Sequence, residues 1–193
     1  MRKMYQSALF LSLITVMAII LSVATVPNAH AMGSIQALGG LWDAGDSGNT
    51  YGLGLRGSLG ETLALDLGWM YYGEGDDIEI DVPRSDEKVK LGGIDSNVFD
   101  FGLRYTFPME LYLGGGLTYF DFDHDVHSID GEWGVYGLAG WSFGGEHLRG
   151  FIEGMYRYTK GTIKYSNDYF EGTLERDIDH DGLAANIGIM YRF

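Results

Sequence analysis

The stretch "GLAANIGIMYRF", residues 182–193, decides the fold class of this chain. Every second residue in it is apolar, which is the two-residue period of a β-strand with two distinct faces. The residues of this face are Leu183, Ala185, Ile187, Ile189, Tyr191 and Phe193. Chain termini are usually polar and frayed. A strand that ends on a bare aromatic side chain therefore predicts that Phe193 is held in an apolar sheet or recognised by another molecule.

The same alternation recurs upstream, and no stretch after residue 33 has a convincing helical period. The segments at 34–42 and 133–143 alternate more weakly, and the alternation does not place Trp42 on the apolar face of its segment. The pattern predicts an all-β domain of eight antiparallel strands. The predicted strands are 34–42, 51–59, 63–72, 98–105, 111–119, 133–143, 150–159 and 182–193.

The predicted connections alternate in length, as expected for an up-and-down arrangement. Short turns are predicted at 59–62, 107–110 and 144–150, and long polar segments at 43–50, 73–96, 121–132 and 160–181. Two long segments contain further alternation, "DIEIDV…KVKL" and "GTIKYS…GTLER", so we expect hairpins that project past the body of the sheet. All three prolines avoid the predicted strands, where proline would remove a ladder donor.

The first 31 residues have the organisation of a secretory signal peptide. Arg2 and Lys3 precede a long uncharged apolar run, and Ala29-His30-Ala31 forms a small-x-small cleavage pattern. We predict a cleaved leader at 1–31 and one domain at 32–193; a permanent transmembrane anchor is the alternative. The sequence has no cysteine, which excludes lipoprotein processing, disulfides and thiolate chemistry. Its net charge of −14 argues against a nucleic-acid partner.

The face opposite the apolar one indicates which way the sheet is turned. It carries small residues, a few arginines and acids, and no lysine within the strands. Such residues suit a narrow lumen in which long side chains cross and pair, while the apolar face meets lipid. The long loops hold 21 of the 27 acidic residues, so one end is strongly acidic. We predict a transmembrane β-barrel with a lumenal ion-pair network that plugs it; a small polar pore is the alternative. The predicted network is Arg56, Asp66, Asp100, Arg104, Glu153 and Arg157.

Leader, eight strands, alternating loop lengths and the terminal "YRF" together resemble the small bacterial outer-membrane barrels of the opacity and OmpA/OmpX type. The resemblance covers the whole mature chain but is one of pattern. It implies an outer-membrane location, both termini in the periplasm and long loops outside the cell. It also implies that the barrel-assembly machinery reads Ile189, Tyr191 and Phe193, and that outer-membrane lipid and lipopolysaccharide are partners.

Two loop motifs, "DFDHD" (121–125) and "DIDHDG" (177–182), place carboxylates two residues apart, as in the first half of a calcium loop. The twelfth position of the second copy is Gly188 instead of a bidentate Glu, and His124 and His127 lack a third ligand fixed by spacing. No complete metal site or cofactor is therefore predicted. Weak Ca²⁺ or Mg²⁺ binding and a solvated acidic rim both remain open for these loops. The candidate residues are Asp121, Asp123, Asp125, Asp177, Asp179 and Asp181.

The fold does not settle the function. We expect a surface protein with a structural, adhesive or partner-binding role for an extracellular ligand, with divalent cations as bridges. A narrow porin-like channel or conduit for small solutes is the alternative. An enzyme is disfavoured: lipid A deacylases use a His-x-Ser pair on the lipid-facing wall, whereas His127 and Ser128 are adjacent and lie in a loop.

Overall fold

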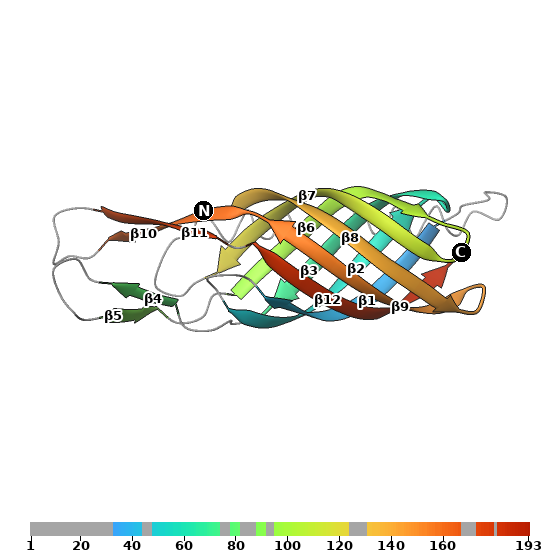
Figure 1. The fold of residues 1–193 in the computed structure, drawn as a ribbon, viewed down its shortest axis with the longest axis horizontal. Coiled ribbons are helices and arrows are strands. Elements are labelled where there is room, and N and C mark those ends of the chain that lie inside the picture. Colours follow the sequence, from blue (N-terminus) through green and yellow to red (C-terminus); the bar gives the residue numbers. More distant parts are fainter. Residues whose placement is uncertain are drawn as a thin grey trace.

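The computed structural model describes residues 33–43, 48–73, 78–81, 88–91, 95–123, 131–166, 173–179 and 181–193, and the predicted leader lies outside them. These residues form strands joined by turns (Figure 1). In the described part of the chain, no helix is long and apolar enough to cross a membrane. The strands are β1 (Gly33–Asp43), β2 (Asn49–Leu59), β3 (Leu63–Tyr72), β4 (Ile78–Asp81), β5 (Lys88–Leu91), β6 (Asp95–Thr106), β7 (Leu111–Asp123), β8 (Glu132–Gly144), β9 (Leu148–Tyr158), β10 (Lys160–Ser166), β11 (Thr173–Asp179) and β12 (Gly182–Arg192).

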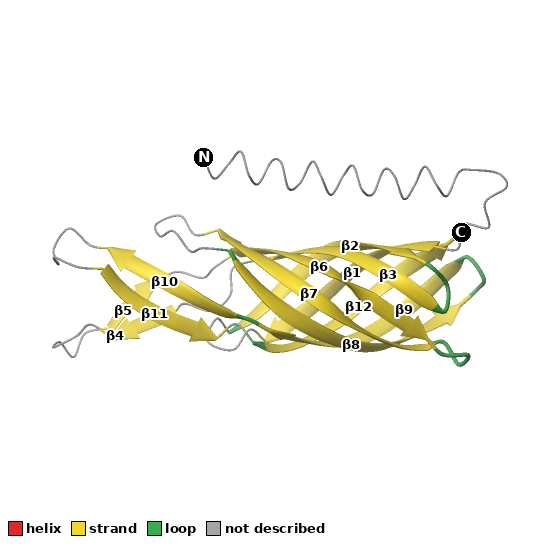
Figure 2. Cartoon of the chain, turned by 90° about the horizontal axis from the view of Figure 1, so that it is seen from above, coloured by secondary structure: helices red, strands yellow, loops and turns green. Residues whose placement is uncertain are grey.

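Eight of the described strands close into an antiparallel barrel in the order β1-β12-β9-β8-β7-β6-β3-β2 (Figure 2). The predicted strand number, direction and order are confirmed. The predicted boundaries differ by a few residues: the turn predicted at 144–150 is only 145–147, because β8 continues to Gly144 and β9 begins at Leu148. Gly144 has a φ of 125°, which glycine adopts without steric cost.

Pairing of the first strand with the last closes the barrel, and it holds the terminal residues in a sheet, which is one of the two possibilities predicted for Phe193. Residues from Ser34 to Trp42 pair antiparallel with residues from Arg192 back to Ala184. The backbone amide of Phe193 donates to the carbonyl of Gly33 at 3.1 Å, which extends the ladder to the last residue. A Cβ atom at Gly33 would lie 2.8 Å from the Phe193 ring. Glycine at this position therefore lets the terminal ring lie against the first strand.

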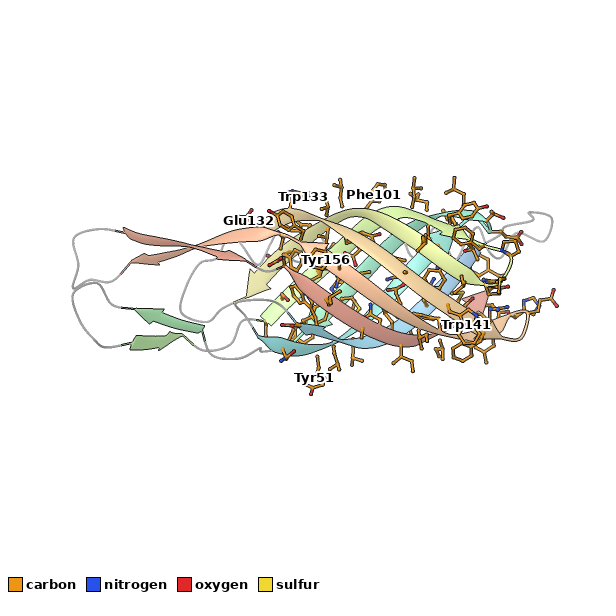
Figure 3. The ribbon with its side chains drawn as sticks, viewed as in Figure 1. Tyr51, Phe101, Glu132, Trp133, Trp141 and Tyr156 are labelled. Atoms are coloured by element: carbon orange, nitrogen blue, oxygen red, sulfur yellow. The ribbon has the colours of Figure 1, made fainter. Side chains whose placement is uncertain are left out.

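The outer wall of the barrel is apolar. Tyr51 is 76% exposed and Leu53 is 72% exposed, and Figure 3 shows labelled aromatic side chains such as Phe101 and Trp133 directed away from the barrel. A water-soluble protein would bury these groups, because each exposed large apolar side chain forgoes roughly 1.5–3 kcal/mol of transfer free energy. Closed barrels satisfy every strand edge internally and can place such a wall against lipid. The predicted orientation of the two faces is confirmed.

Two further sheets of two strands each project beyond the barrel. β4 pairs with β5 and β10 pairs with β11, and neither hairpin joins the barrel sheet. Figure 1 shows both hairpins at the same end, opposite the short turns and the C-terminus. The predicted projecting hairpins are confirmed, and they place part of the long loops well outside the barrel.

Candidate functional site

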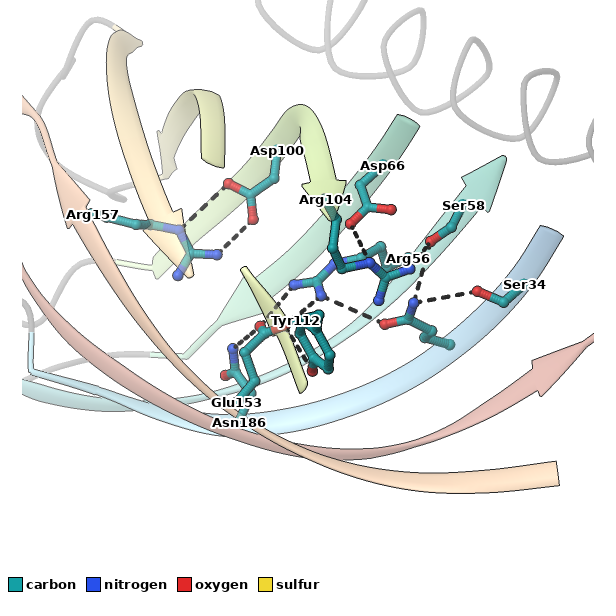
Figure 4. Close-up of polar contacts among 11 residues, drawn as sticks. Ser34, Arg56, Ser58, Asp66, Asp100, Arg104, Tyr112, Glu153, Arg157 and Asn186 are labelled. Carbon is teal, nitrogen blue, oxygen red and sulfur yellow. Dashed lines mark hydrogen bonds and ion pairs between the residues drawn. The ribbon is translucent and has the colours of Figure 1, made fainter. Parts of the chain in front are cut away.

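The lumen is the most distinctive feature of the described chain, because charged side chains fill it. Inward-facing positions on β2, β3, β6 and β9 contribute Arg56, Asp66, Asp100, Arg104, Glu153 and Arg157, and all six are at most 5% exposed. Figure 4 shows them in one polar column together with neighbouring Ser, Tyr and Asn side chains. Alternation along each strand aims these residues inward, and the closed sheet then brings residues far apart in sequence within contact.

Arg56 and Glu153 form the central contact. Arg56 Nη1 lies 2.7 Å from Glu153 Oε2, and Arg56 Nη2 donates to Glu153 Oε1 at 2.9 Å. This is the two-pronged geometry in which arginine binds carboxylate most strongly. Glu153 also accepts hydrogen bonds from Asn186 Nδ2 at 3.1 Å and from the Tyr112 hydroxyl at 3.2 Å. Since β1 and β12 lie between β2 and β9 in the barrel, this cluster joins strands that are not neighbours.

Two further ion pairs lie on either side of this cluster. Towards the long loops, Arg157 Nη2 contacts Asp100 Oδ2 at 2.7 Å, and Arg157 Nη1 donates to the Tyr72 hydroxyl at 2.9 Å. Towards the short turns, Arg104 Nε lies 3.2 Å from Asp66 Oδ2. Each of the six network residues thus has a partner of opposite charge, as burial of a charge requires.

The polar side chains near the short turns join the network. Arg104 Nη2 donates to the Ser58 hydroxyl at 2.8 Å. Gln36 Nε2 lies 3.2 Å from Ser58 Oγ and 3.4 Å from Ser34 Oγ. When the side-chain amide of Gln36 is flipped, its oxygen accepts a hydrogen bond from Arg104 Nη1 at 3.0 Å. The sequence analysis named neither Gln36 nor the two serines as members of the network.

An aromatic layer fills the lumen towards the long loops. The Trp42 ring centroid lies 5.0 Å from that of Tyr72 and 5.3 Å from that of Phe120. The Arg157 guanidinium lies 5.6 Å from the Tyr72 ring centroid. Trp42 is 2% exposed and Phe120 is fully buried. The sequence analysis did not assign this layer, although the off-parity position of Trp42 was the signal that its ring points inward.

A further group of charges lies at the mouth near the short turns. Glu110 Oε2 contacts Arg192 Nη2 at 2.8 Å and Arg149 Nη2 at 3.4 Å. Burial raises the pKa of Glu110, but the hydrogen bond and charge of Arg192 and the charge of Arg149 outweigh it and hold the pKa below its ordinary value. A cavity of about 330 Å³ opens here, with Arg104, Glu110 and Arg192 among its lining residues.

Of the predicted cation-binding residues, the structure describes the side chains of Asp121 and Asp181 only. Asp121 is half-buried on β7, and Asp181 accepts a hydrogen bond from the Tyr156 hydroxyl at 2.7 Å. Asp123 lies on β7 and Asp177 and Asp179 on β11, and the structure describes only their backbones. Asp125, His124, His127 and Ser128 lie outside the described residues. Among the side chains that are described, no group of three or more potential metal ligands occurs.

The predicted assembly signal lies on the outer surface of the closing strand. Ile189 is 61% exposed and Tyr191 is 53% exposed, and the ring of His147 stacks on Tyr191 with 6.0 Å between centroids. Ile189, Tyr191 and Phe193 thus follow one another along the lipid-facing side of the seam. Recognition of this strand by assembly machinery remains a prediction.

These features define a small eight-stranded β-barrel that is located in the outer membrane. The chain is similar in structure to the outer membrane protein OprG from Pseudomonas aeruginosa, with 18% identity, 84% of this chain and 96% of that chain covered, and a TM-score of 0.67. It is also similar to the outer membrane protein AlkL in lipid bilayers, with 13% identity, 88% and 93% covered, and a TM-score of 0.56.

A third solved structure has the same fold. It is a major outer membrane protein from Thermus thermophilus, with 13% identity, 86% of this chain and 100% of that chain covered, and a TM-score of 0.59. No protein-family model and no curated protein matches the chain. At such identities the similarity establishes the fold alone, so the function has to be argued from the residues of this chain.

Proposed function

We propose that this protein is a closed barrel that anchors its acidic extracellular segments in the outer membrane, where they bind a surface partner. The observation that carries the proposal is the set of side-chain contacts inside the lumen. From one end to the other, it contains the Asp66–Arg104 pair, the Arg56–Glu153 pair, the Asp100–Arg157 pair and the Trp42 aromatic layer. A barrel whose interior side chains contact one another across the lumen works as an anchor, so the residues outside the membrane carry the activity.

Conductance tests the closed state directly. In planar lipid bilayers, the wild-type protein is expected to give no stable single-channel current. Arg56→Ala removes the side chain that joins β2 to β9 inside the lumen and leaves space beside Glu153, so it is expected to produce discrete openings. Arg149→Ala, an arginine at the mouth outside the central contact, is the matched control and is expected to stay silent. Stable wild-type current would overturn the anchor proposal in favour of a channel.

A narrow channel is the second candidate function, and the cavity at the short-turn mouth favours it. This cavity of about 330 Å³ reaches Ser34 and Arg104, so polar solutes from the periplasmic side would enter the polar half of the lumen. Passage would still require displacement of the Trp42 layer at the other end. The channel proposal therefore predicts wild-type current that rises when this layer is removed.

We also propose that divalent cations bridge the acidic rim to phosphate groups of lipopolysaccharide. Asp95 on β6 lies directly opposite Asp123 on β7 in the strand register, and Asp121 lies opposite Asn97. Like charges directly opposite each other destabilise a strand pair, so a cation at this level would relieve their repulsion. Asp179, in contrast, lies opposite Lys160, which supplies a positive charge without a metal.

A calcium titration tests the cation proposal. With refolded protein in vesicles that contain lipopolysaccharide, the melting temperature is expected to rise saturably at about millimolar Ca²⁺. The rise is expected to disappear in Asp121→Asn/Asp123→Asn. It is expected to persist in Glu61→Gln/Glu146→Gln, which makes the same charge change at the opposite end. Equal calcium responses in all three proteins would contradict the cation proposal and would indicate that the acidic rim is an ordinary solvated surface.

A further inference from the structure

The short turn between β6 and β7 has an unusual residue at its left-handed position. The other two short turns contain or adjoin a glycine with positive φ, Gly60 at 112° and Gly144 at 125°. This turn uses Glu110 with a φ of 62°, and no other non-glycine residue in the described part of the chain has a positive φ. Glycine adopts such angles without steric cost, whereas a side chain makes them unfavourable. A backbone held in this way points to a role for the side chain that it carries.

Backbone hydrogen bonds hold Glu110 in this conformation. The amide of Phe107 donates to the carbonyl of Leu111 at 2.7 Å, and the amide of Glu110 donates to the carbonyl of Phe107 at 2.9 Å. Three-residue hairpin loops of this kind end on a left-handed residue, and glycine is the usual choice there. The carbonyl of Glu110 also accepts from the amide of Ser142 on β8 at 3.0 Å. The turn is therefore fixed to β8, next to β7 in the barrel.

One oxygen of the Glu110 carboxylate is contacted from three different strands. Its Oε2 atom accepts from the Ser142 hydroxyl of β8 at 3.1 Å and from Arg192 Nη2 of β12 at 2.8 Å. Arg149 Nη2 of β9 lies 3.4 Å from the same oxygen. Because β9 and β8 lie between β12 and β7 in the barrel, Glu110 connects the start of β7 to the last strand across the mouth.

The last three residues of the chain are each held by a different group. The ring of His147 stacks on Tyr191, and the amide of Arg192 donates to the carbonyl of His147 at 2.8 Å. Phe193 and the first residue of β1 exchange two backbone hydrogen bonds, at 3.1 and 3.3 Å. The Arg192 side chain lines the cavity at the mouth, where Glu110 is its acceptor. This ion pair therefore ties the end of the closing strand to a turn on the other side of β8 and β9.

We propose that the ion pair between Glu110 and Arg192 acts as a latch, which keeps the end of β12 paired with β1 at the mouth near the short turns. The contacts of the carboxylate offset the unfavourable backbone angle, which a glycine would avoid. The latch needs both the β6–β7 turn and the paired end of β12, so it is complete only when the barrel has closed. It holds the seam whether or not the lumen conducts.

Backbone amide hydrogen exchange of the refolded protein in lipid, followed residue by residue by NMR, tests the latch. Glu110→Gln keeps the size of the side chain and removes its charge. In this variant the amides of Arg192 and Phe193 are expected to exchange at least about tenfold faster than in the wild type, because the strand end opens locally. The amide of Thr106 is expected to keep its rate, since it donates to the carbonyl of Thr62 at 2.7 Å in another part of the mouth.

Glu61→Gln is the matched control variant. Glu61 is an exposed acid that lines the same cavity, so this variant makes the same charge change without touching the latch. All of these amides are expected to exchange in it at their wild-type rates.

Glu110→Gly separates the carboxylate from its backbone angle. It removes the steric cost of the positive φ, yet the amides of Arg192 and Phe193 are expected to exchange as fast as in Glu110→Gln. Arg192→Met is expected to speed exchange at Phe193 to the same extent. Combining Arg192→Met with Glu110→Gln is expected to add no further increase, because both changes remove the same contact.

Three outcomes would overturn the proposal. If Glu110→Gln and Glu110→Gly leave exchange at Arg192 and Phe193 unchanged, the carboxylate does not hold the strand end. If exchange at Thr106 rises as much as at these two residues, Glu110 supports the barrel as a whole and not its seam. If the effects of Glu110→Gln and Arg192→Met add in the double variant, the two side chains act separately.

Discussion

Replacement of Glu153 by alanine is expected to lower the free energy of unfolding by about 3–5 kcal/mol, because it leaves Arg56 charged and unpaired in the lumen. Glu153 accepts both prongs of Arg56, and Asn186 and Tyr112 also donate to it. Its removal therefore leaves four hydrogen-bond donor groups without this acceptor. Urea-induced unfolding of the barrel in lipid vesicles, followed by tryptophan fluorescence, measures the change.

The double variant Arg56→Met/Glu153→Met separates the loss of the ion pair from the cost of leaving one buried charge unpaired. Replacing both ends of a buried ion pair with apolar groups of similar size is often neutral or even stabilising. The double variant is therefore expected to be more stable than Glu153→Ala alone. Glu146→Ala, an exposed acid in a turn, is the matched control, with an expected change within about 0.5 kcal/mol. If Glu153→Ala costs no more than this control, the network does not hold the barrel walls together.

The second large effect is expected at Trp42. Trp42→Ala removes a buried ring that packs against Tyr72 and Phe120, so we expect a loss of about 3–5 kcal/mol from lost burial and the cavity left behind. The same unfolding measurement applies. The variant is also expected to expose Tyr72 to quenchers added from the long-loop side.

Trp141→Ala is the matched control for this substitution. Trp141 faces lipid and is 45% exposed, so its truncation removes surface contact without opening a cavity inside the barrel. We expect it to cost less than half as much as Trp42→Ala. Equal costs for the two tryptophans would contradict the assignment of Trp42 to a tightly filled lumenal layer.

The sequence by itself determined the strands and their faces. Alternation is a local property of the chain, since neighbouring side chains of a strand point to opposite sides wherever the strand ends up. For this reason the stretch 182–193 predicted which of its residues share a face, and the structure buries the six charged residues of the network on the face opposite the apolar one. Loop lengths and the alternation within two long segments likewise predicted the projecting hairpins.

Only the tertiary structure decided which residues meet across the barrel. The contact between Arg56 and Glu153 spans 97 positions of the chain, and it depends on how the strands are staggered when the sheet closes. The same stagger places Trp42, Tyr72 and Phe120, from three separate strands, in one layer, and it sets Asp95 opposite Asp123. The local sequence pattern predicts the face on which each side chain lies. The stagger of the strands is a property of the closed sheet, so these contacts can be identified only in the folded barrel.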